Sequence, residues 1–218
     1  MNENINKNIW QVFELASQAA KEAGALLDLI GSNLTERFAN DLPSIKQINY
    51  LDQNSDTDKS GWIYCNETRS YDVTPKGKGR RKAIYLIGVQ VVFFDPESNI
   101  TLNQATLNIS LQCDSSSEPF DAENWFCSNG DWEGYSVQTN GMTIANLNDA
   151  NEFSQEDGSD ILFSIPLGAL NSPDDVELKV ISPLRALLEY LDPNASEVVE
   201  AFNNAKDIMK LDAIRFQK

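Results

Sequence analysis

Hydrophobic positions recur every three or four residues near both ends of the chain and every second residue in its middle. The first region, residues 8–30, predicts one long helix with a broad apolar stripe. Gly31 stands where a helix commonly ends, and residues 32–36 favour a short second helix. We expect the stripe to pack in the core, with a partner-binding helix as the alternative. The stripe comprises Ile9, Val12, Phe13, Ala16, Ala19, Ala20, Ala23, Leu26, Leu27 and Ile30.

The strongest strand signal is the run from Ala83 to Phe94, which only Gly88 and Gln90 interrupt. Its β-branched and aromatic residues predict a central strand that is buried on both faces. Asn140-Gly141 lies between two alternating stretches and is a strong hairpin signal. Residues 49–61 are polar and predict a loop. The further strands expected from alternation are 62–65, 70–73, 100–102, 107–111, 135–139, 142–145, 161–167 and 176–181.

The end of the chain returns to helical spacing. Ser182-Pro183 and Asp192-Pro193 each place a capping residue before a proline, and they predict helices over 183–191 and 193–211. We therefore expect one α+β domain over residues 1–218. It would contain an N-terminal helical segment (1–40), a mostly antiparallel sheet of about six to eight strands (61–181) and two C-terminal helices (182–218).

The composition limits the kinds of catalytic and metal site that the chain can form. A length of 218 residues with 41% hydrophobic content suits a single globular domain. The chain has no histidine, which excludes Ser-His-Asp and Cys-His catalysis and any His-ligated zinc. Its three cysteines lack CxxC spacing, so we expect no metal site. The start of the sequence does not resemble a signal peptide, and no apolar run is long enough to cross a bilayer. We therefore expect a cytoplasmic protein that does not bind a membrane.

The positive charges are distributed unevenly. Residues 83–178, which we call the acidic block, contain 16 Asp and Glu and no Lys or Arg. The segments before and after it are each balanced, so the block carries the whole net charge of −16. A surface of one sign repels nucleic acid and attracts basic proteins. The alternative is an acidic surface that serves only solubility.

An aromatic and acidic segment lies inside the acidic block. Trp and Tyr are common anchors of protein interfaces, and flanking carboxylates would steer a basic partner toward them. The alternative is that the aromatic residues fill the core. The candidate partner-binding residues are Asp121, Glu123, Trp125, Phe126, Asp131, Trp132, Glu133 and Tyr135.

A glycine-containing basic loop precedes the central strand. It carries Lys76, Lys78, Arg80, Arg81 and Lys82, but it matches neither the P-loop nor the dinucleotide-binding pattern. The favoured interpretation is a solvated hairpin tip, since charges beside an apolar strand oppose aggregation. Direct binding of nucleic acid is the alternative, and the adjacent acidic block argues against it. Contact between this loop and the acidic block of a second copy would form a homo-oligomer.

Glu177 and Lys179 form an ExK tripeptide in the expected strand 176–181, with Asp160 upstream. This arrangement resembles the core of the PD-(D/E)xK nuclease superfamily. The resemblance implies that Asp160 and Glu177 hold Mg²⁺ while Lys179 polarises the attacking water. The alternative is a strand that simply exposes a Glu and a Lys.

Taken together, these features favour a non-catalytic acidic module that binds a basic protein, with no cofactor. It would be an inhibitor, an immunity or antitoxin factor, or a nucleic-acid mimic, as in conflicts between phages and bacteria. The alternatives are a Mg²⁺-dependent nuclease that uses Asp160, Glu177 and Lys179, and a structural subunit that docks through the N-terminal stripe.

Overall fold

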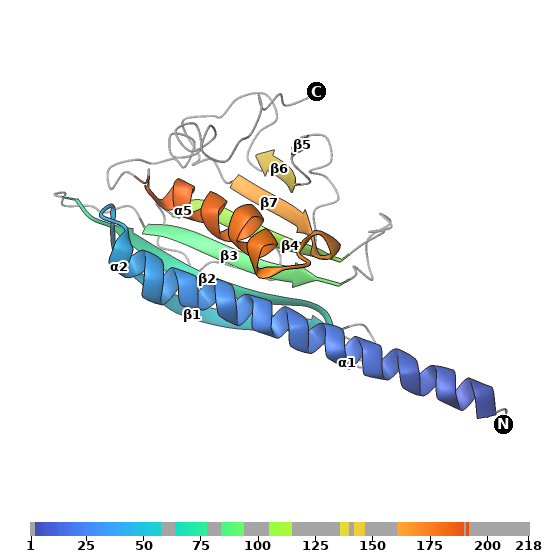
Figure 1. Cartoon of the computed structure of the whole chain (residues 1–218). Coiled ribbons are helices and arrows are strands. Elements are labelled where there is room, and N and C mark those ends of the chain that lie inside the picture. Colours follow the sequence, from blue (N-terminus) through green and yellow to red (C-terminus); the bar gives the residue numbers. More distant parts are fainter. Residues whose placement is uncertain are drawn as a thin grey trace.

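The computed structural model describes residues 3–57, 64–77, 84–93, 105–114, 136–139, 142–146, 161–189 and 191. These residues form an α+β fold in which helices pack on an antiparallel sheet, as the sequence predicts (Figure 1). The helical elements are α1 (Glu3–Ser32), η1 (Asn33–Phe38), α2 (Ala39–Asp41), η3 (Leu167–Ala169), α4 (Pro173–Val176), η4 (Glu177–Ile181) and α5 (Ser182–Glu189). The strands are β1 (Ile45–Thr57), β2 (Tyr64–Pro75), β3 (Ile84–Val92), β4 (Thr106–Asp114), β5 (Ser136–Thr139), β6 (Met142–Asn146) and β7 (Ile161–Pro166).

The strands pair in the order β1-β2-β3-β4-β7-β6-β5, and each pair is antiparallel. The first four strands form a meander, β7 pairs with β4, and the predicted β5–β6 hairpin extends the sheet beyond β7. The sheet therefore does not span residues 61–181 as expected. It begins at Ile45, and its last strand ends at Pro166.

The prediction of a polar loop over residues 49–61 is wrong for residues 49–57, because they belong to the edge strand β1. Every other position of an edge strand can be polar, and three irregularities in the β1–β2 register further weaken the alternation. β1 pairs with β2 along the length of both strands, and this pairing stabilises a strand that the local sequence does not predict.

The prediction of a strand buried on both faces is confirmed for β3. Every residue from Tyr85 to Val92 is buried. The odd-numbered residues Tyr85, Ile87, Val89 and Val91 belong to the hydrophobic core shared with the helices. The even-numbered residues point to the opposite face, because successive side chains alternate in a strand.

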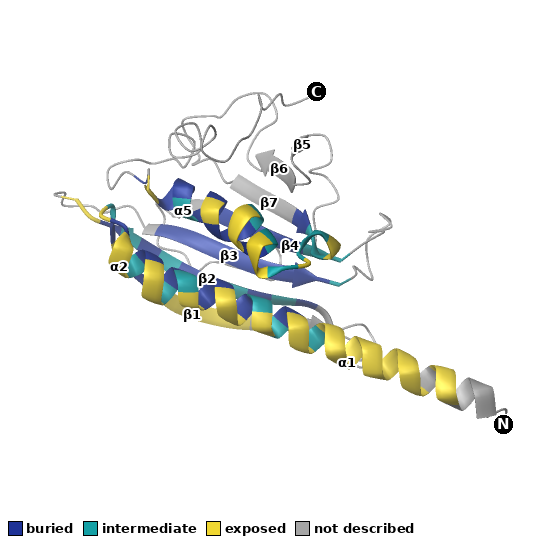
Figure 2. Ribbon diagram, in the orientation of Figure 1, coloured by how far each residue is buried: buried dark blue, intermediate teal, exposed yellow. Residues whose placement is uncertain are grey.

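Helix α1 runs along the sheet and packs only its C-terminal part against it (Figures 1 and 2). Ala23, Leu27 and Ile30 are buried in the core, and the helical chain continues through η1, where Leu34 and Phe38 are fully buried. The expected helix end at Gly31 is therefore wrong. Gly31 instead permits a close approach, since an added Cβ would lie 2.6 Å from the hydroxyl of Tyr71.

The expected strand 176–181 is also wrong, because these residues are helical in α4 and η4. Its apolar residues Val176, Val180 and Ile181 recur at helical as well as alternating spacing, and all three are buried in the core. Ser182 has helical backbone angles, so it does not cap a new helix before Pro183. The wider turn of η4 precedes Pro183, which lacks a backbone N–H and would clash with a regular preceding turn.

The helix predicted over 183–191 is confirmed in large part by α5, where Leu184, Leu187 and Leu188 are buried. The hydroxyl of Ser44 donates to the carbonyl of Leu188 at 2.9 Å and ties this helix to the start of β1. The expected helix 193–211 and strand 100–102 lie outside the described residues.

Replacing Gly31 with alanine should destabilise the protein, because the new methyl group would overlap the buried Tyr71 hydroxyl. We expect a loss of about 1–2 kcal/mol in the free energy of unfolding, measured by urea denaturation. Tyr71→Phe removes the overlapping oxygen and should shrink this loss in a double-mutant cycle. Gly24 of the same helix has open space around its Cβ position. Gly24→Ala should therefore stabilise by up to about 1 kcal/mol, and equal effects at the two glycines would contradict this packing.

Candidate functional site

The aromatic and acidic segment cannot be placed, since all eight of its candidate residues lie outside the described part of the chain. Of the basic loop, only Lys76 is described; it is exposed, and its backbone N–H donates to the carbonyl of Ser44. Lys78, Arg80, Arg81 and Lys82 lie outside the described residues, as does Asp160.

The ExK tripeptide lies in a helix, so the strand on which the nuclease resemblance rests is absent. Residues two apart on a helix do not share a face. Accordingly, Lys179 donates to Asp175 at 2.8 Å and to the carbonyl of Ala169 at 2.7 Å. Glu177 is exposed and lies 3.5 Å from Arg37 of η1. Lys179 and Glu177 are engaged in separate contacts, so their arrangement does not support the nuclease interpretation.

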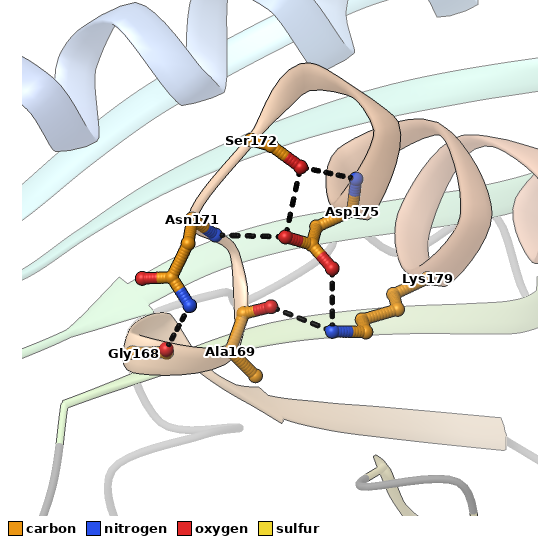
Figure 3. A network of polar contacts seen from close by, with 6 residues as sticks. All are labelled: Gly168, Ala169, Asn171, Ser172, Asp175 and Lys179. Carbon is orange, nitrogen blue, oxygen red and sulfur yellow. Dashed lines mark hydrogen bonds and ion pairs between the residues drawn. The ribbon is translucent and has the colours of Figure 1, made fainter.

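Asp175 organises a polar network at the start of α4 (Figure 3). The hydroxyl of Ser172 accepts from the Asp175 N–H at 3.1 Å and donates to its carboxylate at 2.9 Å. The hydrogen bonds from Lys179 and Ser172 lower the pKa of Asp175. This is a helix cap reinforced by an ion pair, and its role is structural. The signature Ser172-Pro173 could have revealed it, since it repeats the cap-and-proline pattern recognised at Ser182-Pro183.

A second charged cluster joins α1 to β2. Arg69 binds Asp28 of α1 at 2.5 Å and Glu67 of its own strand at 3.3 Å. Burial opposes the charge of Arg69, but its contacts with Asp28 and Glu67 outweigh this and raise its pKa. Gln53 of β1 donates to Glu67 at 3.1 Å. The cluster fixes the position of α1 over the sheet, and its cation is already neutralised by two carboxylates.

The sheet face opposite the helical core buries a row of polar residues beside the apolar Leu86 and Val92. Thr68, Gln90 and Asn108 are cross-strand neighbours on β2, β3 and β4, and each is at most 5% exposed. Gln90 donates to Thr68 at 2.9 Å. The register extends this row of polar residues across all seven strands, to Asn54 on one side and to Ser164, Thr143 and Gln138 on the other.

This row was missed in the sequence, although polar residues alternate visibly along β2 and β4. Such alternation usually indicates a solvated face, and burial of a polar face leaves no local signal. Hydrogen bonding between cross-strand neighbours favours one register of the strands, since a slip of one residue would bury apolar groups in their place.

The most exposed apolar surface in the described structure is the N-terminal half of α1. This helix extends beyond the sheet, and Figure 2 shows most of the extension as exposed. We call residues 7–22 the projecting segment. Trp10 is 64% exposed, Phe13 53% and Val12 64%. The expectation of core packing therefore holds only from Ala23 onward, and this projecting apolar face is a candidate docking surface.

The described residues contain no group of three or more Asp, Glu or Cys side chains that could hold a metal ion. Within the same ranges, no helix combines the length and apolar character that a membrane crossing requires. No protein-family model, curated protein or solved structure matches this chain. The sequence and the geometry of the described residues are therefore the basis for inferring function.

The lowered pKa of Asp175 makes a pH-dependent contribution to stability. A carboxyl group with a depressed folded-state pKa stabilises the protein above its unfolded pKa, and this stabilisation is lost as pH falls through the folded value. Asp175→Asn should therefore lower the thermal unfolding midpoint at pH 7, and the difference from wild type should shrink below about pH 4. Asp174→Asn, at the exposed neighbouring position, is the matched control. A pH-independent difference for Asp175→Asn would contradict the ion-pair role.

Proposed function

We propose that this protein is a non-catalytic interaction module whose acidic block docks a basic protein partner. The single observation that carries the proposal is the absence of Lys and Arg from residues 83–178, against 16 acidic residues. Acidic residues are only slightly denser there than elsewhere in the chain, so the selective feature is the absence of positive charge. A surface of one sign speeds association with a partner of the opposite sign.

The contacts of four described cations show which carboxylates are already engaged within the chain. Arg37, Arg69, Lys179 and Arg185 each pair with a carboxylate of the same chain. Two of these pairs involve the acidic block itself, because Arg37 contacts Glu177 and Lys179 contacts Asp175, so these two carboxylates are already engaged within the chain. The functional classes that fit are an inhibitor, an immunity or antitoxin factor, and a nucleic-acid mimic, because each presents negative charge to a basic target.

A second candidate function is that of a subunit in a larger assembly. The observation that favours it is the exposed apolar face of the projecting segment, which includes Trp10 and Phe13. A large aromatic side chain on a free helix is a common anchor for a protein partner. This surface is separate from the acidic block, so the two candidates can be tested separately.

The acidic-block proposal predicts that charge reversal weakens partner capture. Three tagged proteins are used to capture partners from native cells: wild type, the double variant Asp131→Lys/Glu133→Lys and the control Glu36→Lys/Asp41→Lys. The captured proteins are eluted with rising salt and identified by mass spectrometry. We expect wild type and control to retain a basic protein that the first variant loses. With the purified partner, association with the first variant should be about tenfold slower at low salt.

The control replaces the same number of exposed carboxylates outside the acidic block. It therefore separates an effect of position from an effect of net charge. Equal retention by all three proteins, or retention of no basic protein, would reject the proposal.

A further inference from the structure

We propose that the projecting segment pairs antiparallel with the same segment of a second copy of this chain. The inference rests on the second candidate function and names its partner. It does not involve the basic loop or the acidic block.

The first argument is continuity with an interface that already exists in the molecule. Phe13, Ala16, Ala20, Ala23, Leu27, Ile30 and Leu34 are spaced alternately by three and four residues. This is the spacing by which one helix packs along another. The last four are at most 5% exposed and pack in the core. The first three continue the same face beyond the sheet, where Phe13 and Ala16 are exposed.

The second argument is the position of the charges. Lys7, Glu14, Lys21 and Glu22 are the charged residues of the projecting segment, and their sum is zero. All four lie on the side of the helix away from Phe13 and Ala16, as the helical period of 3.6 residues requires. The face formed by Phe13, Ala16 and Ala20 is therefore free of charge and does not repel an identical helix, whereas Trp10 borders the charged side.

The third argument is shape. The bulky residues Trp10, Val12 and Phe13 lie toward the N-terminal end of the projecting segment, and Ala16, Ala19 and Ala20 follow them. When two copies run antiparallel about the point between Glu14 and Leu15, the two segments overlap over their whole length. Phe13 of each copy then lies opposite Ala16 of the other, so a large residue meets a small one on each side of the centre of the pair. A parallel pair would place large against large and leave gaps between alanines.

The fourth argument is electrostatic. Each copy carries a net charge of −16. The projecting segment is about 24 Å long at 1.5 Å per residue, so an antiparallel pair places the two acidic bodies at opposite ends. That separation exceeds the Debye length of about 8 Å at physiological salt. A parallel pair would bring the bodies together and increase their repulsion.

The test is the mass of the full chain by sedimentation and light scattering between about 1 and 100 μM, the range in which a small helical interface dissociates. We expect a dimer of the 24.3 kDa chain that dissociates on dilution. Phe13→Glu should weaken dimerisation at least about tenfold. Leu15→Glu is the matched control, since Leu15 is 66% exposed but lies off the apolar face. This control should dimerise like wild type.

Three further measurements complete the test. Circular dichroism should show both variants folded, because the projecting segment makes few contacts with the body. The dimer should persist from about 0.15 to 0.5 M salt, since its interface carries no charge, unlike docking by the acidic block. Small-angle X-ray scattering should show two bodies at opposite ends of an elongated particle.

Any of three results would overturn the proposal. These are a monomer at all concentrations, a dimer that Phe13→Glu leaves intact, and a compact dimer with adjacent bodies. The assembly function is judged separately, by capture from native cells. If the chain is monomeric but Phe13→Glu loses a protein that Leu15→Glu retains, the assembly function stands and the second copy is rejected. If the two variants capture the same proteins and neither alters the mass, both are rejected.

Discussion

The burial of β3 on both faces is the constraint on which the rest of this structure depends. A strand without a solvated face needs neighbours on both edges and cover on both sides. β2 and β4 supply the edges, and the helices from the two ends of the chain cover one face. Elements distant in sequence therefore meet at one core, which links Leu27 of α1 to Leu187 of α5.

The two faces of the sheet are stabilised by different means. The helical face is apolar, and one charged cluster around Arg69 positions α1 at its margin. The opposite face buries Thr68, Gln90 and Asn108 as cross-strand neighbours. Apolar packing contributes most of the stability in such folds, while buried polar groups with hydrogen-bond partners favour one arrangement over similar ones.

The net negative charge and the exposed apolar residues belong to different parts of the sequence. The negative charge belongs to residues 83–178, whereas the exposed apolar residues concentrate on the projecting segment of α1. Two chains that each carry a net charge of −16 repel one another. A neutral helix that extends away from the body is therefore well suited to bring two such chains together.

The sequence by itself determined the elements whose signals are local and strong: the long N-terminal helix, the doubly buried β3, the Asn140-Gly141 hairpin and the α+β class. Only the tertiary structure decided the rest. β1 is a strand because β2 pairs with it. Residues 176–181 have apolar residues at a spacing that fits a helix or a strand, and they are helical where Val176, Val180 and Ile181 pack in the core. Gly31 lies within a helix where its missing Cβ leaves room for Tyr71, and Phe13 is exposed because the sheet ends before it. Each of these depends on distant partners, which local periodicity does not encode.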